Sequence, residues 1–185
     1  MKAVLRPVTP ADTAVLMEIY GSTRADELAT TDWDDARKQA FIKQQFDAQD
    51  AYYRANYVNA RYDLIVAGGK PAGRLYTARW PDEIRIMDIA LLPAFRGRGI
   101  GRKLLTSLQK EAGPAGRALR IHVERFNPAL SLYVRLGFQL VEDRGVYLFL
   151  EWTSSDATVA SGASAATSPG ISNQTATGDQ ENTAS

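Results

Sequence analysis

The spacing of hydrophobic positions changes several times along the first 152 residues and predicts alternating strands and helices. Short runs rich in Ile, Val and Leu predict strands, and apolar residues three or four positions apart predict helices. The predicted strands are residues 3–6, 63–67, 72–78, 83–92, 119–123, 138–142 and 146–152. The predicted helices follow Thr9, span about residues 33–57 and 100–112, and open at Asn127-Pro128.

Turn and capping residues place the boundaries of these elements. Thr9 before Pro10 is typical of a helix N-cap, and Asp32 predicts the start of the long helix. Two hairpins are predicted, at Gly68-Gly69-Lys70-Pro71 and at Asp143-Arg144-Gly145. The resulting order, β α α β β β α β α β β, predicts one α/β domain in which about four helices flank a mixed, mostly antiparallel sheet of about seven strands.

The composition changes abruptly after Trp152. Residues 153–185 are almost entirely Ser, Thr, Ala, Gly and other small or polar residues, with no aromatic side chain. Such a segment buries too little apolar surface to offset the entropy lost on ordering. We therefore expect a folded domain over residues 1–152 and a disordered tail over residues 153–185, with a docking peptide in the tail as the alternative.

Composition excludes several kinds of site. The chain has 185 residues, no cysteine and one histidine, which excludes disulfides, thiolate or multi-histidine metal sites and a cysteine nucleophile. No apolar run reaches membrane-spanning length and no signal-like segment opens the chain, so a cytoplasmic location without a membrane partner is expected. The net charge is +1, or about +4 without the three acids of the tail, which disfavours nucleic acid as a partner.

The segment LLPAFRGRGIGRKLL, residues 91–105, joins a predicted strand to a basic helix. Its glycines alternate with arginines in the order Arg96, Gly97, Arg98, Gly99, Ile100, Gly101, Arg102. Glycine permits positive φ and close approach of the backbone to a ligand, and the free N–H groups of a helix N-terminus favour an anion. The segment therefore predicts a phosphate or pyrophosphate site, with a plain glycine-rich turn as the alternative. It carries neither the P-loop pattern nor GxGxxG, which disfavours a dinucleotide site.

Two segments resemble signatures of the GCN5-related N-acetyltransferase (GNAT) superfamily. IALLPAFRGRGIGRKLL resembles its acetyl-CoA-binding segment, Arg/Gln-x-x-Gly-x-Gly/Ala, which Arg96, Gly99 and Gly101 match. NPALSLYVRLGF resembles its second signature, in which an Asn opens a helix and a Tyr precedes Leu-Gly-Phe. Both occur in the family order, and the resemblance covers about residues 3–152. It implies a single-domain GNAT-like acyl-CoA N-acyltransferase fold and transfer of the acetyl group of acetyl-CoA to an amine of a small molecule or peptide, without a metal.

The resemblance also implies where acetyl-CoA binds. Its pyrophosphate would contact the backbone N–H groups of residues 97–102, and its pantetheine would extend along Ile89, Ala90 and Leu91. The N–H of Leu91 would then polarise the thioester carbonyl. Asn127 would make a further cofactor contact, although its position equally fits a helix N-cap.

Acetyl transfer needs a proton acceptor for the amine and a proton donor for the departing thiolate. The resemblance places Tyr133 as the donor, while its spacing with Ala129 and Leu136 equally predicts a core position. The candidate bases are His122, Asp88 and Glu124. A water relay is the alternative to all three, and a surface or pocket-wall position is the alternative for His122.

The sequence does not select the acceptor. Acidic residues that could bind a cationic amine, or cap helices, are Asp26, Glu27, Asp32, Asp34 and Asp35. Aromatic residues that could line a groove, or fill the core, are Trp33, Tyr52, Tyr53 and Tyr147. Competing functions are an acyltransferase for longer acyl-CoA, a CoA-binding module without catalysis, and a nucleic-acid binder at the arginine-rich loop. The sequence does not decide whether the protein forms a homodimer.

Overall fold

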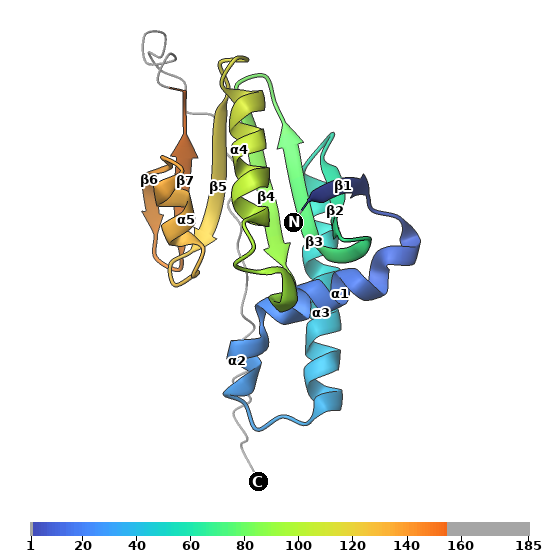
Figure 1. Ribbon diagram of the computed structural model, residues 1–185. Helices are drawn as coiled ribbons and strands as arrows, with labels where there is room; N and C mark the ends of the chain where they lie inside the picture. Colours follow the sequence, from blue (N-terminus) through green and yellow to red (C-terminus); the bar gives the residue numbers. More distant parts are fainter. Residues whose placement is uncertain (1, 155–185) are drawn as a thin grey trace.

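A single seven-stranded sheet organises the domain (Figure 1). The computed structural model describes residues 2–154, and the predicted tail from residue 155 onward lies outside the described residues. The strand order is β1-β2-β3-β4-β5-β7-β6, and every neighbouring pair is antiparallel except the parallel pair β4 and β5. The strands are β1 (Ala3–Pro7), β2 (Arg61–Ala67), β3 (Lys70–Arg79), β4 (Glu83–Leu91), β5 (Ala118–Glu124), β6 (Gln139–Arg144) and β7 (Tyr147–Trp152).

Helices cover both faces of this sheet. They are α1 (Thr13–Thr23), α2 (Ala25–Ala29), α3 (Asp35–Asn56), α4 (Ile100–Ala112) and α5 (Leu130–Arg135), with short 3₁₀ turns at Pro10–Asp12 and Pro93–Phe95. The predicted mixed, mostly antiparallel α/β sheet is confirmed. The additional helix α2 is too short to give a hydrophobic period, so the pattern of apolar residues did not indicate it.

Two hydrophobic clusters lie on opposite faces of the sheet. One packs α4 and α5 against the sheet and includes Ile86, Ile100, Leu105, Leu119 and Leu150. The other packs α1 and α3 against the opposite face and includes Ile19, Phe46, Tyr53, Leu64 and Tyr76. In Figure 1, α4 crosses in front of β4 and β5 while α3 passes behind β2 and β3. Each face therefore has its own core, and the sheet separates them.

The sheet splits between β4 and β5 at their carboxyl ends. The two strands pair in parallel from Glu83 with Ala118 to Ile86 with Ile121, and no further pairs join them. Met87 forms a bulge at this point, because Tyr76 faces Asp88 while Thr77 faces Ile86. A bulge bends and twists its strand. Residues 87–91 therefore follow β3, while the end of β5 follows β7, and a gap opens between the two halves.

Two helices begin later in the structure than the sequence predicted. Helix α3 begins at Asp35 and is capped by Asp34, whose side chain accepts a hydrogen bond from the N–H of Arg37 at 2.7 Å. The predicted cap, Asp32, lies two residues too early. Helix α5 begins at Leu130 instead of following Asn127 directly. The side chain of Asn127 instead closes a turn before the helix, accepting from the N–H of Ala129 at 2.8 Å.

Candidate active site at the split of the sheet

The glycine loop, residues 96–102, connects the end of β4 to α4 at the edge where the sheet splits (Figure 1). Gly97 has φ 71° and Gly99, the N-cap of α4, has φ 75°. Both angles lie in the left-handed region that favours glycine. A Cβ atom at either position would have no atom within 4 Å, so the loop has open space in front of its backbone.

The backbone N–H groups of this loop are available to a ligand. Within residues 2–154, no acceptor receives a hydrogen bond from the N–H groups of residues 97–102. Helix α4 extends for thirteen residues behind them, so its dipole adds positive potential at the same point. A run of unpaired donors at a helix N-terminus fits a phosphate or pyrophosphate group.

Arg96 fixes the loop against the rest of the domain. Its Nε donates to the carbonyl oxygen of Leu91 at 2.8 Å, and its Nη2 donates to the carbonyl oxygen of Ser22 at 3.2 Å. The side chain of Arg98 instead lies over the ring of Phe95, with its Cζ 5.9 Å from the ring centroid. The predicted cofactor arginines are therefore not equivalent, since Arg96 ties the loop to β4 and α1.

The backbone of Leu91 is directed into the split. Leu92 donates its N–H to Ala72 of β3 at 2.9 Å. Successive residues of a strand direct their N–H groups to opposite sides, so the N–H of Leu91 points away from β3. The bond from Arg96 to the Leu91 carbonyl agrees with this direction. On the other side, β3 and β4 approach closely at Gly73, where a Cβ would lie 2.1 Å from the carbonyl oxygen of Ala90.

A cavity of about 760 Å³ occupies the split on the α1 and α3 face. Its lining comes from α1, α2, α3, β3, β4, β5, α5 and β7. The predicted site residues that line it are Asp88, Ile89, Ala90, His122, Asn127 and Tyr133. The glycine loop does not line the cavity. The structure thus brings the candidate catalytic residues together in one cavity and places the candidate pyrophosphate site at the neighbouring surface.

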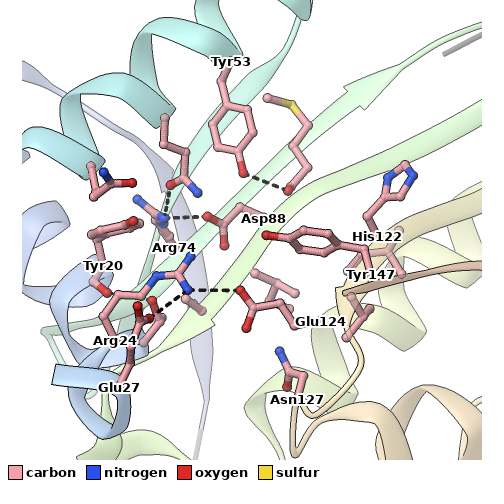
Figure 2. A pocket seen from close by; sticks show the side chains of 18 of the residues that line it. Tyr20, Arg24, Glu27, Tyr53, Arg74, Asp88, His122, Glu124, Asn127 and Tyr147 are labelled. Carbon is pink, nitrogen blue, oxygen red and sulfur yellow. Dashed lines mark hydrogen bonds and ion pairs between the residues drawn. The ribbon is translucent and has the colours of Figure 1, made fainter. Parts of the chain in front are cut away.

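Three residues at the base of this cavity form what we call the Asp88 cluster: Gln49, Arg74 and Asp88. Arg74 Nη2 lies 2.5 Å from Asp88 Oδ2 and 2.7 Å from Gln49 Oε1. The side chain of Arg74 is 2% exposed and that of Asp88 is 14% exposed. Tyr53 holds the bulge beside the cluster, because its hydroxyl donates to the carbonyl oxygen of Met87 at 3.2 Å. Figure 2 shows the Arg74–Asp88 pair of this cluster, beside Tyr53.

Tyr133 belongs both to the core and to the cavity. Its ring packs edge-on against Phe138, with centroids 5.4 Å apart, and its side chain is buried in the cluster under α4 and α5. It also lines the cavity. Burial raises the pKa of Tyr133, and the charge of Asp88 raises it further. The phenol is therefore protonated at neutral pH and stands within electrostatic reach of Asp88.

His122 lies in an environment that disfavours its charged form. Its ring stacks on Phe149 with centroids 4.6 Å apart, and its Nε2 lies 3.5 Å from Arg144 Nη1. Burial, followed by the charges of Arg85 and Arg144, lowers the pKa of His122 to about 4. His122 is therefore a much weaker base than a free imidazole.

An ion pair crosses the front of the cavity. Arg24, between α1 and α2, has its Nη1 3.2 Å from Glu124 Oε1 at the end of β5 and 3.5 Å from Glu27 Oε2. In Figure 2 the guanidinium of Arg24 lies between these two carboxylates. Residues one hundred positions apart are thus joined across the split.

The structure separates the remaining candidates. Asp26, Glu27, Tyr52, Tyr53 and Tyr147 line the cavity. Asp34 caps α3, and Trp33 packs against Phe41 with ring centroids 5.4 Å apart, outside the cavity. Sequence reasoning missed Arg24, Gln49 and Arg74. Arg74 did leave a signal, because it is a charged residue in a strand whose neighbours are buried.

The fold and the site together define a class of transferase domain. The sequence model of the acetyltransferase (GNAT) domain matches residues 44–140, just over half of the chain. The chain belongs to the GNAT acetyltransferase family. An N-alpha-acetyltransferase RimI of Mycobacterium tuberculosis is 34% identical over 102 residues, which cover 55% of this chain and 63% of the relative. An uncharacterized protein of Mycobacterium leprae, ML0378, is also 34% identical over 102 residues, but these are only 28% of its length.

Solved structures support the fold. PaiA N-acetyltransferase from Thermoplasma acidophilum, in complex with coenzyme A, has a TM-score of 0.62 at 18% identity, covering 82% of this chain and 98% of that one. An acetyltransferase from Thermus thermophilus has a TM-score of 0.59 at 22% identity, covering 82% of this chain and 97% of that one.

Among residues 2–154, no helix is long and apolar enough to cross a membrane, and no group of three or more acidic or histidine side chains could hold a metal ion.

Proposed function

We propose that the protein transfers the acetyl group of acetyl-CoA to a primary amine of a small molecule or peptide, and that residues 1–152 form the catalytic unit. The observation that carries this proposal is the position of Asp88 and Tyr133 in one cavity, at the split beside the glycine loop. The open backbone of the loop fits the pyrophosphate of acetyl-CoA, and Ile89 to Leu91 form the strand edge along which pantetheine would extend. Acetyl-CoA supplies the acyl group as a thioester.

Each residue then has one task. Asp88 accepts a proton from the acceptor ammonium, which leaves the nitrogen free to form a bond to the acyl carbon. The N–H of Leu91 donates to the acyl oxygen as negative charge develops there. Tyr133 gives its proton to the sulfur as the carbon–sulfur bond breaks, and it can do so because its raised pKa keeps it protonated. The nitrogen loses its second proton as the amide forms; this proton replaces the one that Tyr133 gave, and Asp88 passes its own proton to water. His122 is the second candidate base, because burial and the neighbouring arginines lower its pKa to about 4 and a neutral imidazole offers no negative charge to the ammonium.

The acceptor is proposed only as a class. The Mycobacterium tuberculosis relative is an N-alpha-acetyltransferase, which supports including peptide α-amines in that class. The cavity of about 760 Å³, lined by four carboxylates and two arginines, can hold a cationic amine of moderate size. Longer acyl chains are the second donor class to test, because the glycine loop would contact only the CoA part.

The first test is calorimetric titration of the full chain with acetyl-CoA, with NADH as a control ligand. We expect binding of acetyl-CoA and no binding of NADH. Transfer is then measured as release of free CoA thiol in the presence of an amine. The chain has no cysteine, so a thiol reagent reports CoA alone. Binding without transfer to any amine would favour the non-catalytic CoA-binding module.

A further inference from the structure

Arg74 is an unusual residue for the interior of a sheet. It lies in β3 among buried apolar neighbours, and its side chain is 2% exposed. Its guanidinium lies near two aromatic rings, with its Cζ 5.7 Å from the centroid of Tyr20 and 5.1 Å from that of Tyr76. These contacts and the bonds to Gln49 and Asp88 restrict the position and orientation of the guanidinium.

Stability does not explain why this position carries a charge. Moving an ion pair from water into the interior costs free energy that its mutual attraction often fails to recover. A buried pair replaced by apolar residues of similar volume is often as stable or more stable. The Arg74–Asp88 pair faces the cavity, so a role in the cavity explains these two buried charges better than a role in stability does.

The geometry leaves one carboxylate oxygen of Asp88 free. Arg74 Nη2 contacts Oδ2 at 2.5 Å, while Oδ1 accepts no hydrogen bond from residues 2–154. The side chain of Asp88 lines the cavity and is 14% exposed, so a ligand in the cavity can reach the carboxylate. Figure 2 shows this second oxygen on the cavity side of the pair. Gln49 accepts from the same Nη2 at 2.7 Å and so fixes the arginine from the α3 side.

We propose that Arg74, held by Gln49, is a positioning residue that orients Asp88 so that Oδ1 receives the ammonium group of the acceptor. This inference rests on the proposed function. A primary amine arrives mostly protonated at neutral pH, since its pKa is about 10. Oδ1 binds this cation and takes one of its protons, while Oδ2 remains bonded to Arg74. Arg74 touches neither the acceptor nor the acyl group and acts through Asp88.

The test compares Arg74→Met with the wild type on three amine probes: butylamine, spermidine and trialanine amide. We expect kcat to fall roughly 10- to 100-fold on every probe that the wild type acetylates, as for loss of a well-placed base. The dissociation constant of acetyl-CoA should stay within about twofold, because the glycine loop is untouched. Arg74→Lys should recover part of the loss, since lysine restores the charge but not the fixed planar geometry.

A double-mutant cycle separates positioning from a structural role. In Asp88→Asn the carboxylate is gone, so adding Arg74→Met should lower kcat by less than about twofold further. If Arg74→Met lowers kcat equally in both backgrounds, Arg74 does not act through Asp88 and the proposal is wrong. Gln49→Met keeps the ion pair and removes only the 2.7 Å bond, so it tests the proposal even if Arg74→Met fails to fold. It should lower kcat by roughly two- to tenfold, and an unchanged kcat would count against the proposal.

A matched control is Arg54→Met. Arg54 also lies over an aromatic ring, 4.9 Å from the centroid of Tyr62, and pairs with Asp50 at 2.7 Å, but its side chain is 58% exposed and outside the cavity. We expect wild-type kcat. If the wild type acetylates a probe and Arg74→Met does so equally well, the inference fails while the proposed function stands. If the wild type acetylates none of the probes, the proposed function itself fails.

Discussion

The glycine loop and the Asp88 cluster are built in opposite ways. The loop consists of consecutive residues and offers backbone N–H groups, so most of its side chains are free to vary. The Asp88 cluster takes one side chain each from α3, β3 and β4, and depends on contacts of 2.5 and 2.7 Å between them. A backbone site is therefore sensitive to φ and to Cβ atoms, whereas the cluster is sensitive to the identity of each side chain.

The largest effect should come from Tyr133, which lines the same cavity as the Asp88 cluster. We expect Tyr133→Phe to lower kcat by roughly 10- to 1,000-fold, because the departing thiolate loses its proton donor. The dissociation constant of acetyl-CoA, measured by calorimetry, should change little. Tyr52→Phe is the matched control, since Tyr52 lines the same cavity while its hydroxyl is buried without a hydrogen-bond partner. Full activity in Tyr133→Phe would assign Tyr133 to the core alone.

Gly99→Val tests the backbone character of the loop. Valine is strained at φ 75°, so the loop would change shape and its N–H groups would no longer converge. We expect the dissociation constant of acetyl-CoA to rise roughly 10- to 100-fold, equivalent to about 1.4 to 2.8 kcal/mol. Gly68→Val is the control, because Gly68 has φ 59° and equally open space, but in the hairpin between β2 and β3. Equal affinity in the two variants would argue against a cofactor site at the loop.

Glu124→Gln tests the ion pair across the cavity. Glu124 is 45% exposed, and exposed ion pairs contribute about 0 to 1 kcal/mol. We therefore expect the KM for the amine to change by at most about fivefold, with kcat and the affinity for acetyl-CoA unchanged. A loss of kcat comparable to that of Asp88→Asn would make Glu124 the base and reverse the assignment.

The smallest effect is expected at His122. Its pKa is lowered to about 4, so it is neutral throughout pH 6 to 8 and does not titrate there. His122→Gln should therefore leave the pH profile of kcat/KM unchanged in shape over that range, with values within about twofold. Loss of a titration near pH 6.5 in this variant would show that His122, and not Asp88, takes the proton.

Local features of the chain were predictable from the sequence. Helix α4 runs from Ile100 to Ala112 as expected, and both hairpins occur where glycine allows positive φ, at Gly68, Gly69 and Gly145. The reason is that capping, turns and the glycine loop depend on neighbouring residues only. The exact start of α3 was harder to predict, because Asp32, Asp34 and Asp35 are all suitable caps and only the backbone selects Asp34.

The side-chain clusters were not predictable in the same way. Arg74 reaches Asp88 only because the bulge at Met87 shifts the register between β3 and β4. Arg24 reaches Glu124 across one hundred residues, through the packing of α1 on the sheet. Neither the bulge nor that packing leaves a period in the sequence. The candidate bases Asp88, His122 and Glu124 could thus be named from the sequence, but their partners and environments could not.

The split between β4 and β5 has a consequence for the folded state without ligand. Residues 87–91 have a strand on one side only, so the middle of the sheet contains an unprotected edge. Such edges invite pairing with foreign strands. A molecule that fills this edge binds the native state and not the unfolded chain, which stabilises the domain by RT ln(1 + [L]/Kd). A ligand bound along this edge would therefore raise the stability of the domain as its concentration rises, and would also cover the backbone groups that could pair with a foreign strand.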